Sequence, residues 1–204
     1  MATEIELKVR LNDYASVKER LSVVGNYCRS YKKSDCYWLP VQPINGTTAG
    51  MSIPATGVRV RRDSGIEADG FVHESVLATY KIKNISGGIE VNQECEFTVS
   101  DAGMFEELLS RLGLRNAVRK EKEGWAWTIT SQIAGQAPIL AELSMVKNLG
   151  WFLEIEILAD DDCEQTVEES RGRLFALLDK LEIPKEWIED RPYTVMLANV
   201  STNI

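Results

Sequence analysis

The sequence predicts an α+β fold that is built mainly from antiparallel strands, and three observations lead to this prediction. About eight segments alternate between apolar and polar residues or are rich in aromatic ones, as strands are. Most connections between these segments are short, which is typical of antiparallel sheets. About three further segments carry apolar residues at helical spacing. Eight antiparallel strands can close into a barrel, which removes exposed edges.

The expected strands follow from this alternation and from the turn-forming residues between them. They cover residues 2–11, 27–39, 58–62, 77–83, 89–99, 115–130, 139–146 and 151–158. Turns are expected at Asp63-Ser64-Gly65, Ser86-Gly87-Gly88 and Asn148-Leu149-Gly150. Residues 40–57 contain three prolines and three glycines and should form a long loop, whereas residues 191–200 should be helical or irregular.

Capping residues and glycines delimit the expected helices. Two helices follow Glu-x-Glu strands: Asn12 and Asp13 can cap the first, which ends at Gly25, and Ser100 and Asp101 can cap the second, which ends at Gly113. This recurrence predicts two related βα halves, about 1–88 and 89–204, within one domain over residues 1–204. A third helix is expected over 164–181, because Asp162 and Gln165 have the spacing of a capping box.

The composition excludes several functional classes. Acidic residues outnumber Lys and Arg by 31 to 23, so a generic basic nucleic-acid binder is not expected. No apolar run approaches the roughly 18 residues that span a bilayer, and the acidic N-terminus resembles no targeting signal. The four cysteines lack CxxC spacing, which favours reduced, mostly core-filling thiols and a cytoplasmic protein. With a single histidine, His73, carboxylates, Lys and Arg must carry any chemistry, and we expect His73 to be dispensable.

Paired charges on single strand faces are the most informative pattern. Glu4 and Glu6 lie about 7 Å apart along a strand, and Lys8 follows on the same face. Carboxylates at this spacing can bind one or two Mg²⁺ or Mn²⁺ ions without any histidine. The same spacing recurs in Arg59 and Arg61, Lys81 and Lys83, Glu94 and Glu96, Lys120 and Lys122, and Glu154 and Glu156. These faces either form salt bridges on an open sheet or line a wet, charged tunnel.

In this order and spacing the motifs resemble those of the CYTH superfamily, also called triphosphate tunnel metalloenzymes. The matching residues are Glu4, Glu6 and Lys8, Arg59 and Arg61, Lys81 and Lys83, Glu94 and Glu96, Lys120, Lys122 and Trp125, and Leu149 to Glu156. Within the superfamily the chain is most similar to the class IV adenylyl cyclase branch, through Thr79-Tyr80-Lys81 and Arg191-Pro192-Tyr193 among others. The resemblance implies an eight-stranded antiparallel barrel with a charged hydrophilic tunnel, flanking helices, a triphosphate substrate and Mg²⁺ or Mn²⁺.

The resemblance also implies roles for individual side chains. The expected metal ligands are Glu4, Glu6, Glu142, Glu154 and Glu156. The expected substrate contacts are Lys8, Arg59, Arg61, Lys81, Lys83, Glu94, Glu96, Lys120, Lys122 and Arg191, of which Lys8, Arg59, Arg61 and Lys81 are the expected catalytic residues. Asn92 stands where the family has Arg, Lys122 replaces a second Arg, and Ser144 replaces an Asp metal ligand. Glu142, on the same face as Ser144, is the expected substitute.

The leading functional expectation is therefore conversion of ATP to cyclic AMP and pyrophosphate. An inorganic or thiamine triphosphatase on the same scaffold is the alternative enzyme, with water attacking the terminal phosphorus. A non-catalytic polyphosphate- or nucleotide-binding module is the third alternative, which Asn92 and Ser144 favour. The expected partner is a small triphosphate (ATP, tripolyphosphate or thiamine triphosphate), without nucleic acid or membrane, and a homodimer is left open.

Overall fold

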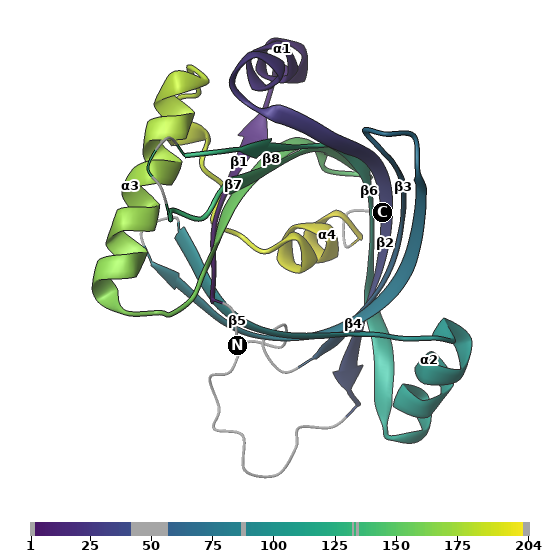
Figure 1. Cartoon of the computed structure of the whole chain (residues 1–204). Coiled ribbons are helices and arrows are strands. Elements are labelled where there is room, and N and C mark those ends of the chain that lie inside the picture. Colours follow the sequence, from purple (N-terminus) through teal and green to yellow (C-terminus); the bar gives the residue numbers. More distant parts are fainter. Residues whose placement is uncertain (1–2, 42–56, 87–88, 132, 134, 202–204) are drawn as a thin grey trace.

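The predicted strands close into a barrel (Figure 1). The computed structural model describes residues 3–41, 57–86, 89–131, 133 and 135–201. Within these ranges eight strands follow one another around the barrel in the order β1-β5-β4-β3-β2-β6-β7-β8, and every neighbouring pair is antiparallel. The predicted fold class is therefore confirmed.

The elements lie close to the predicted ranges. The strands are β1 (Thr3–Leu11), β2 (Asn26–Pro40), β3 (Val58–Glu67), β4 (Val72–Ser86), β5 (Ile89–Thr98), β6 (Leu114–Ile129), β7 (Ile139–Val146) and β8 (Gly150–Ala159). The helices are α1 (Tyr14–Val24), α2 (Ala102–Arg111), α3 (Glu164–Lys180) and α4 (Tyr193–Ser201), with a short 3-10 helix η2 (Lys185–Trp187). None of these helices is long and apolar enough to span a membrane.

The turn predicted at Asp63-Ser64-Gly65 is wrong. Strand β3 continues through these residues to Glu67, and the reversal lies at 68–71, where Gly70 has a φ of 87°. Gly65 serves a different purpose: a Cβ at this position would lie 2.3 Å from the carbonyl oxygen of Ser30 on the neighbouring strand. The glycine therefore permits a close approach of β2 and β3.

Three other predictions concern the cap of helix α3, the four cysteines and the loop over residues 40–57. The predicted capping box is wrong, because α3 is capped by Cys163, whose Sγ accepts from the backbone N–H of Thr166 at 3.5 Å. The Asp161 carboxylate accepts from the backbone N–H of Cys163 at 3.0 Å, and the helix begins at Glu164, where it was predicted to begin. All four cysteines are free as predicted, but only Cys36 is buried, so most do not fill the core. Of the predicted loop, residues 42–56 lie outside the described ranges.

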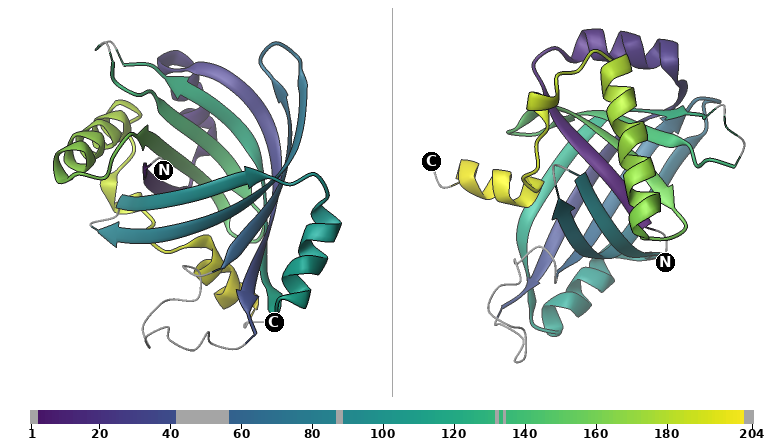
Figure 2. Two further views of the ribbon diagram at one scale, coloured as in Figure 1. Left: turned by 60° about the horizontal axis from the view of Figure 1, so that its bottom comes forward. Right: turned by 90° about the vertical axis from the view of Figure 1, so that its left-hand side faces the viewer.

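The apolar core lies outside the barrel wall. Ile5, Leu7 and Val9 of β1 are fully buried on the outward face, where they join α1 and α3 in one apolar cluster. Figure 2 shows α3 lying along the side of the barrel. Burial of each such side chain contributes about 1.5–3 kcal/mol. Because this outer core holds the fold, the inner strand faces are free to carry charge.

Helix α4 covers one end of the barrel (Figures 1 and 2). Its residues Tyr193, Met196 and Leu197 pack with Val146 and Phe152, whose side chains are buried at this end. The rings of Tyr193 and Phe152 meet edge to face, with centroids 5.1 Å apart. The segment predicted as helical or irregular is therefore a helix, and it gives the barrel one covered end.

Candidate active site

The inner face of the barrel encloses a cavity of about 370 Å³ with a charged lining. The cationic lining residues within the described ranges are Lys8, Arg29, Lys33, Arg59, Arg61, Lys120 and Lys122. The acidic ones are Glu4, Glu6, Asp63, Glu90, Glu96, Glu142, Glu154 and Glu156. Eight carboxylates thus face seven cations, so this part of the lining is not net positive.

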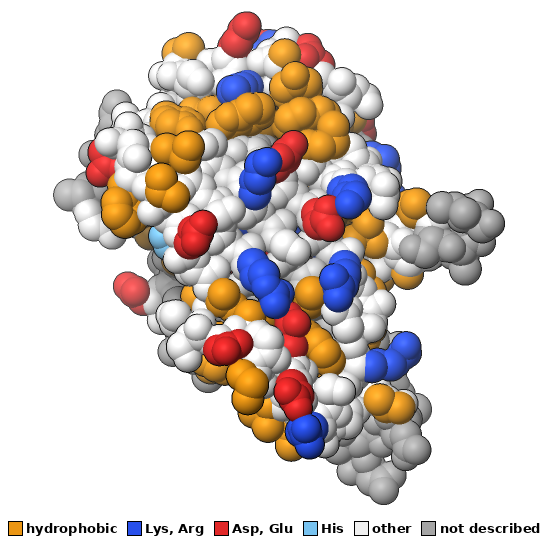
Figure 3. All heavy atoms as spheres, turned by 90° about the vertical axis from the view of Figure 1, so that its right-hand side faces the viewer, with side chains coloured by type: hydrophobic (Ala, Val, Ile, Leu, Met, Phe, Trp, Pro, Cys, Tyr) orange, Lys and Arg blue, Asp and Glu red, His pale blue; other side chains and the backbone are white. Residues whose placement is uncertain are grey.

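The outer face of β2, β3 and β6 is charged in a different way. Figure 3 shows acidic and basic side chains interspersed on this side of the molecule. They form exposed pairs, such as Lys147 with Glu121 at 2.7 Å and Lys32 with Glu123 at 3.5 Å. Exposed pairs of this kind contribute little to stability. The predicted charge pairs on β1, β3, β6 and β8 therefore line the tunnel, and the salt bridges of the outer face are formed by other residues.

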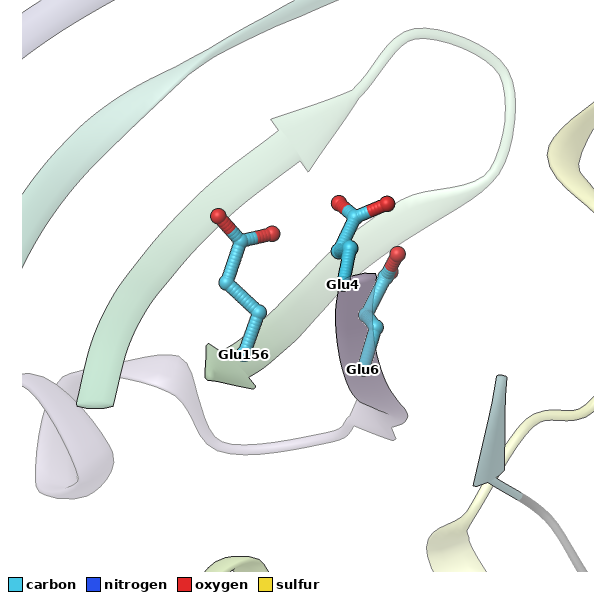
Figure 4. Close-up of side chains that lie close together, drawn as sticks. All are labelled: Glu4, Glu6 and Glu156. Atoms are coloured by element: carbon cyan, nitrogen blue, oxygen red, sulfur yellow. The ribbon is translucent and has the colours of Figure 1, made fainter. Parts of the chain in front are cut away.

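Three glutamates converge inside the barrel (Figure 4). They lie farther along β1 and β8 than Phe152, on which α4 packs. Glu4 and Glu6 come from β1, and Glu156 of β8 lies directly opposite Glu6 in the strand register. One carboxylate oxygen from each lies within 4.8 Å of the others. Asn92 donates a hydrogen bond to Glu4 Oε2 at 3.1 Å, which orients that carboxylate.

The chemistry of this carboxylate triad fits a hard divalent cation. Burial raises the pKa of Glu156 well above its ordinary value of 4.5, and the negative charges of Glu4 and Glu6 raise it further. Like charges so close together are stable only when a proton or a cation offsets them. Mg²⁺ and Mn²⁺ prefer carboxylate oxygens as protein ligands, so the three glutamates are suited to hold one of these ions.

Glu142 and Glu154 lie against lysines instead. Lys122 Nζ donates to Glu154 at 2.5 Å and to Glu142 at 2.9 Å, and Lys33 also donates to Glu142. Burial alone would raise the pKa of Glu142, but the two ammonium groups outweigh it and hold this pKa well below 4.5. Burial lowers the pKa of Lys33 from 10.5 to about 8, although Glu142 opposes the shift. That Glu142 and Glu154 bind metal stays a prediction.

Asp35 forms a second buried ion cluster deeper in the wall. Its side chain is fully buried, and Arg61 donates to both carboxylate oxygens at 2.7 and 2.9 Å. Lys120 Nζ lies 3.0 Å from Oδ2 of the same carboxylate. Burial would raise the pKa of Asp35, but Arg61 and Lys120 hold it well below 3.8. Two predicted phosphate contacts therefore already share an internal counterion.

The remaining predicted site residues fall into three groups. Lys8 and Arg59 face the cavity, with Lys8 Nζ 3.6 Å from Glu90 and Arg59 Nη2 3.4 Å from Glu96. Lys81, Lys83 and Glu94 are placed by backbone register alone, since their side chains lie outside the described part; Lys81 pairs with Glu94. Arg191 is about half exposed, pairs with Glu189 at 2.5 Å and does not line the described cavity.

The sequence analysis does not include Lys33 and Asp35 among the site residues, because the aromatic residues of segment 27–39 predict a strand without indicating that its inner face is charged. Yet Lys33 and Asp35 alternate with Ser34 and Cys36 at the period of two that revealed the pairs on β1. The same test applied to β2 indicates a charged inner face.

Comparison with known proteins places these features in context. The family model of the CYTH domain matches residues 53–193. Protein PH1819 of Pyrococcus horikoshii OT3 is similar in structure with a TM-score of 0.72 at 24% identity, covering 96% of this chain and 98% of its own. A candidate adenylate cyclase of Vibrio parahaemolyticus gives a TM-score of 0.69 at 17% identity, with 96% and 97% covered.

A more distant neighbour is the Hippeastrum protein HpAC1, a candidate adenylyl cyclase with a dominant triphosphatase activity. Its TM-score is 0.56 at 11% identity, with 98% of this chain and 96% of that chain covered. No curated protein sequence matches the chain. At these identities the structural neighbours establish the fold alone.

Proposed function

Because the chain belongs to the CYTH family, we propose that it is a metal-dependent enzyme that acts on a triphosphate in the barrel tunnel. The observation that carries this proposal is the carboxylate triad of Glu4, Glu6 and Glu156 beside a cation-rich wall. The described lining has no excess of cations over carboxylates. A polyanion therefore needs additional positive charge to bind there, and a divalent cation on the triad would provide it.

In this proposal each group of side chains has a distinct task. Glu4, Glu6 and Glu156 hold Mg²⁺ or Mn²⁺, which neutralises phosphate charge and lowers the pKa of the attacking hydroxyl. Lys8, Arg59 and Arg61 bind phosphate oxygens and stabilise the charge that develops in the transition state. Lys81 is proposed for the same task on the strength of its motif. Arg59 and Arg61 can bind two oxygens each, whereas lysines act as point charges.

Two leucines beside the triad support a nucleotide as the substrate. Leu158 lies opposite Glu4 and Leu140 opposite Glu156 in the strand register, and both line the cavity. Leu158 is 56% exposed, so this end of the tunnel reaches solvent. A base resting on these leucines would place its α-phosphate nearest the triad and its terminal phosphate nearest Arg61 and Lys120. This orientation favours cyclisation, in which the ribose 3′-oxygen bonds to the α-phosphorus, pyrophosphate leaves and the hydroxyl proton passes to solvent.

The second candidate is a triphosphatase acting on tripolyphosphate or thiamine triphosphate. It is favoured by the charged remainder of the described lining, which suits any triphosphate regardless of what it carries. In that reaction water attacks the terminal phosphorus and the bond to the bridging oxygen breaks. The two candidates differ in the nucleophile, which is the ribose 3′-oxygen or water, and in the phosphorus that it attacks.

A product assay tests the proposal directly. The protein is incubated with ATP, tripolyphosphate or thiamine triphosphate plus Mg²⁺ or Mn²⁺, and cyclic AMP, pyrophosphate and phosphate are resolved. We expect cyclic AMP and pyrophosphate from ATP; phosphate alone would indicate the triphosphatase, and metal-dependent binding without turnover would indicate a binding module.

Two variants make the assay specific to the triad. Glu6→Gln should abolish turnover while leaving the fold intact, because Glu6 faces the tunnel rather than the apolar core. Glu106→Gln removes a carboxylate outside the described tunnel lining and should change nothing. Activity in EDTA equal to that in Mn²⁺ would overturn the proposed metal dependence.

A further inference from the structure

The first turn of α4 contributes to the tunnel wall. Pro192, Tyr193 and Thr194 line the cavity together with the charged residues of the strands. Tyr193 is only 7% exposed, and two cations lie close to its ring: Lys8 Nζ is 4.8 Å and Lys120 Nζ is 4.7 Å from the ring centroid. An anion bound by these two lysines would therefore lie beside Tyr193.

Two hydroxyls in this turn lack protein partners. The Tyr193 hydroxyl and Thr194 Oγ1 are both buried, and neither has a hydrogen-bond partner among the described residues. Buried hydroxyls in folded proteins nearly always have a partner, because leaving one unpaired is unfavourable. Two adjacent exceptions on a cavity wall indicate a ligand that supplies acceptor oxygens.

The start of α4 adds a second favourable feature for an anion. The helix begins at Tyr193, so the positive end of its dipole faces the cavity that this residue lines. The unpaired hydroxyls, the two neighbouring ammonium groups and the helix terminus all favour negative charge at the same place. Phosphate oxygens combine that charge with several acceptor lone pairs.

We propose that Tyr193 and Thr194 are substrate-binding residues that donate hydrogen bonds to phosphate oxygens of the triphosphate in the tunnel. This inference rests on the proposed function and extends it. It makes the C-terminal helix part of the substrate site rather than only a cover for the barrel end. It also assigns binding to side chains that carry no charge, which no motif of paired charges reveals.

The variants Tyr193→Phe and Thr194→Val test this role, because each removes a hydroxyl while keeping the shape of the side chain. Tyr27→Phe is the matched control: Tyr27 is 44% exposed, packs on Trp127 and does not line the described cavity. Two quantities are measured for each protein. One is the melting temperature without ligand, and the other is the calorimetric Kd for imidotriphosphate with Mn²⁺, an analogue whose bridging nitrogens resist hydrolysis.

We expect Tyr193→Phe to weaken imidotriphosphate binding about tenfold or more, as for a hydrogen bond to a charged acceptor. The ligand-free melting temperature should stay the same or rise, because an unpaired buried hydroxyl is removed. Thr194→Val should also weaken binding without lowering the melting temperature, and Tyr27→Phe should leave the affinity unchanged.

The outcomes separate this inference from the function on which it rests. Wild-type affinity in both Tyr193→Phe and Thr194→Val would overturn the inference alone. A lower ligand-free melting temperature would also overturn it, since the hydroxyls would then have structural partners. If the wild-type protein itself fails to bind imidotriphosphate with Mn²⁺, the proposed function fails as well.

Discussion

Asp35→Asn is the substitution whose effect on stability the structure predicts most directly. The fully buried Asp35 carboxylate accepts both hydrogen bonds of the Arg61 guanidinium, at 2.7 and 2.9 Å, and lies 3.0 Å from Lys120 Nζ. Asn keeps the volume of the side chain but leaves two buried cations without their counterion. Removing one partner of a buried ion pair typically costs about 3–5 kcal/mol. We therefore expect Asp35→Asn to lower the free energy of unfolding by about 3–5 kcal/mol at pH 7.

Urea unfolding followed by tryptophan fluorescence measures this loss, and the chain has five tryptophans as probes. Glu106→Gln is the matched control, because it breaks the Arg62–Glu106 pair, which has the same 2.7 Å separation but side chains 43% and 20% exposed. For this pair the expected loss is below about 1 kcal/mol. A loss below about 1 kcal/mol for Asp35→Asn, with an unchanged m value, would refute the reasoning.

The same variant has a predicted pH dependence and ligand response. The folded-state pKa of Asp35 is depressed below 3.8, so its contribution is present above that pH and is lost as the pH falls through the folded pKa. The stability gap between wild type and Asp35→Asn should thus be constant between about pH 5 and 7 and narrow below about pH 4. Because Arg61 and Lys120 lose their counterion, tripolyphosphate should raise the melting temperature of the variant more than that of wild type.

Three further predictions concern single side chains. Glu156→Gln removes one of three crowded negative charges, so it should leave metal-free stability unchanged or higher while weakening Mn²⁺ binding at least tenfold by calorimetry. Glu142→Ala separates two roles: loss of the partner of Lys33 and Lys122 should cost about 3–5 kcal/mol, and loss of a predicted metal ligand should also weaken Mn²⁺ binding by calorimetry, whereas an unchanged Mn²⁺ affinity would show that Glu142 is an ion-pair partner only. His73→Ala should retain activity, since the His73 ring hydrogen-bonds to the Ser75 hydroxyl and does not line the described cavity; a loss above about a hundredfold would contradict a histidine-free mechanism.

The barrel was predictable because each strand has two faces of different chemistry. On β1 the outward residues are apolar and the inward ones charged, so alternation alone places the strand and its faces. The lengths of β3 and β4 were underestimated for a physical reason. The sequence does not distinguish a glycine that allows two strands to approach closely, such as Gly65, from a glycine in a turn. The sequence does not contain the distance to Ser30 that distinguishes the two.

The residues of the site were more predictable than their partners. Glu154 and Glu156 belong to one motif, yet Glu156 joins the carboxylate triad and Glu154 binds Lys122. The strand register separates them, since Glu156 lies opposite Glu6 and Glu154 opposite Lys8 and Glu142. The register of the strands is set when the eight strands close into the barrel. This closure brings together residues as far apart in the sequence as Lys33 and Glu142, which form an ion pair. A motif read along one strand therefore identifies charged faces but not the ion pairs between them.

These pairings determine how the tunnel would discriminate among anions. Lys8, Arg59 and Arg61 each face a carboxylate, so an incoming anion must compete with Glu90, Glu96 or Asp35 for its cation. When a monovalent anion binds one of these cations, the internal ion pair of that cation is broken, so the net affinity for the anion is small. A triphosphate would contact several cations at once. A divalent ion on the triad would attract it further, and no carboxylate of the protein competes with the triphosphate for that extra charge. The near balance of charge in the described lining thus favours metal-bound polyphosphates over simple anions, which a purely cationic tunnel would also bind.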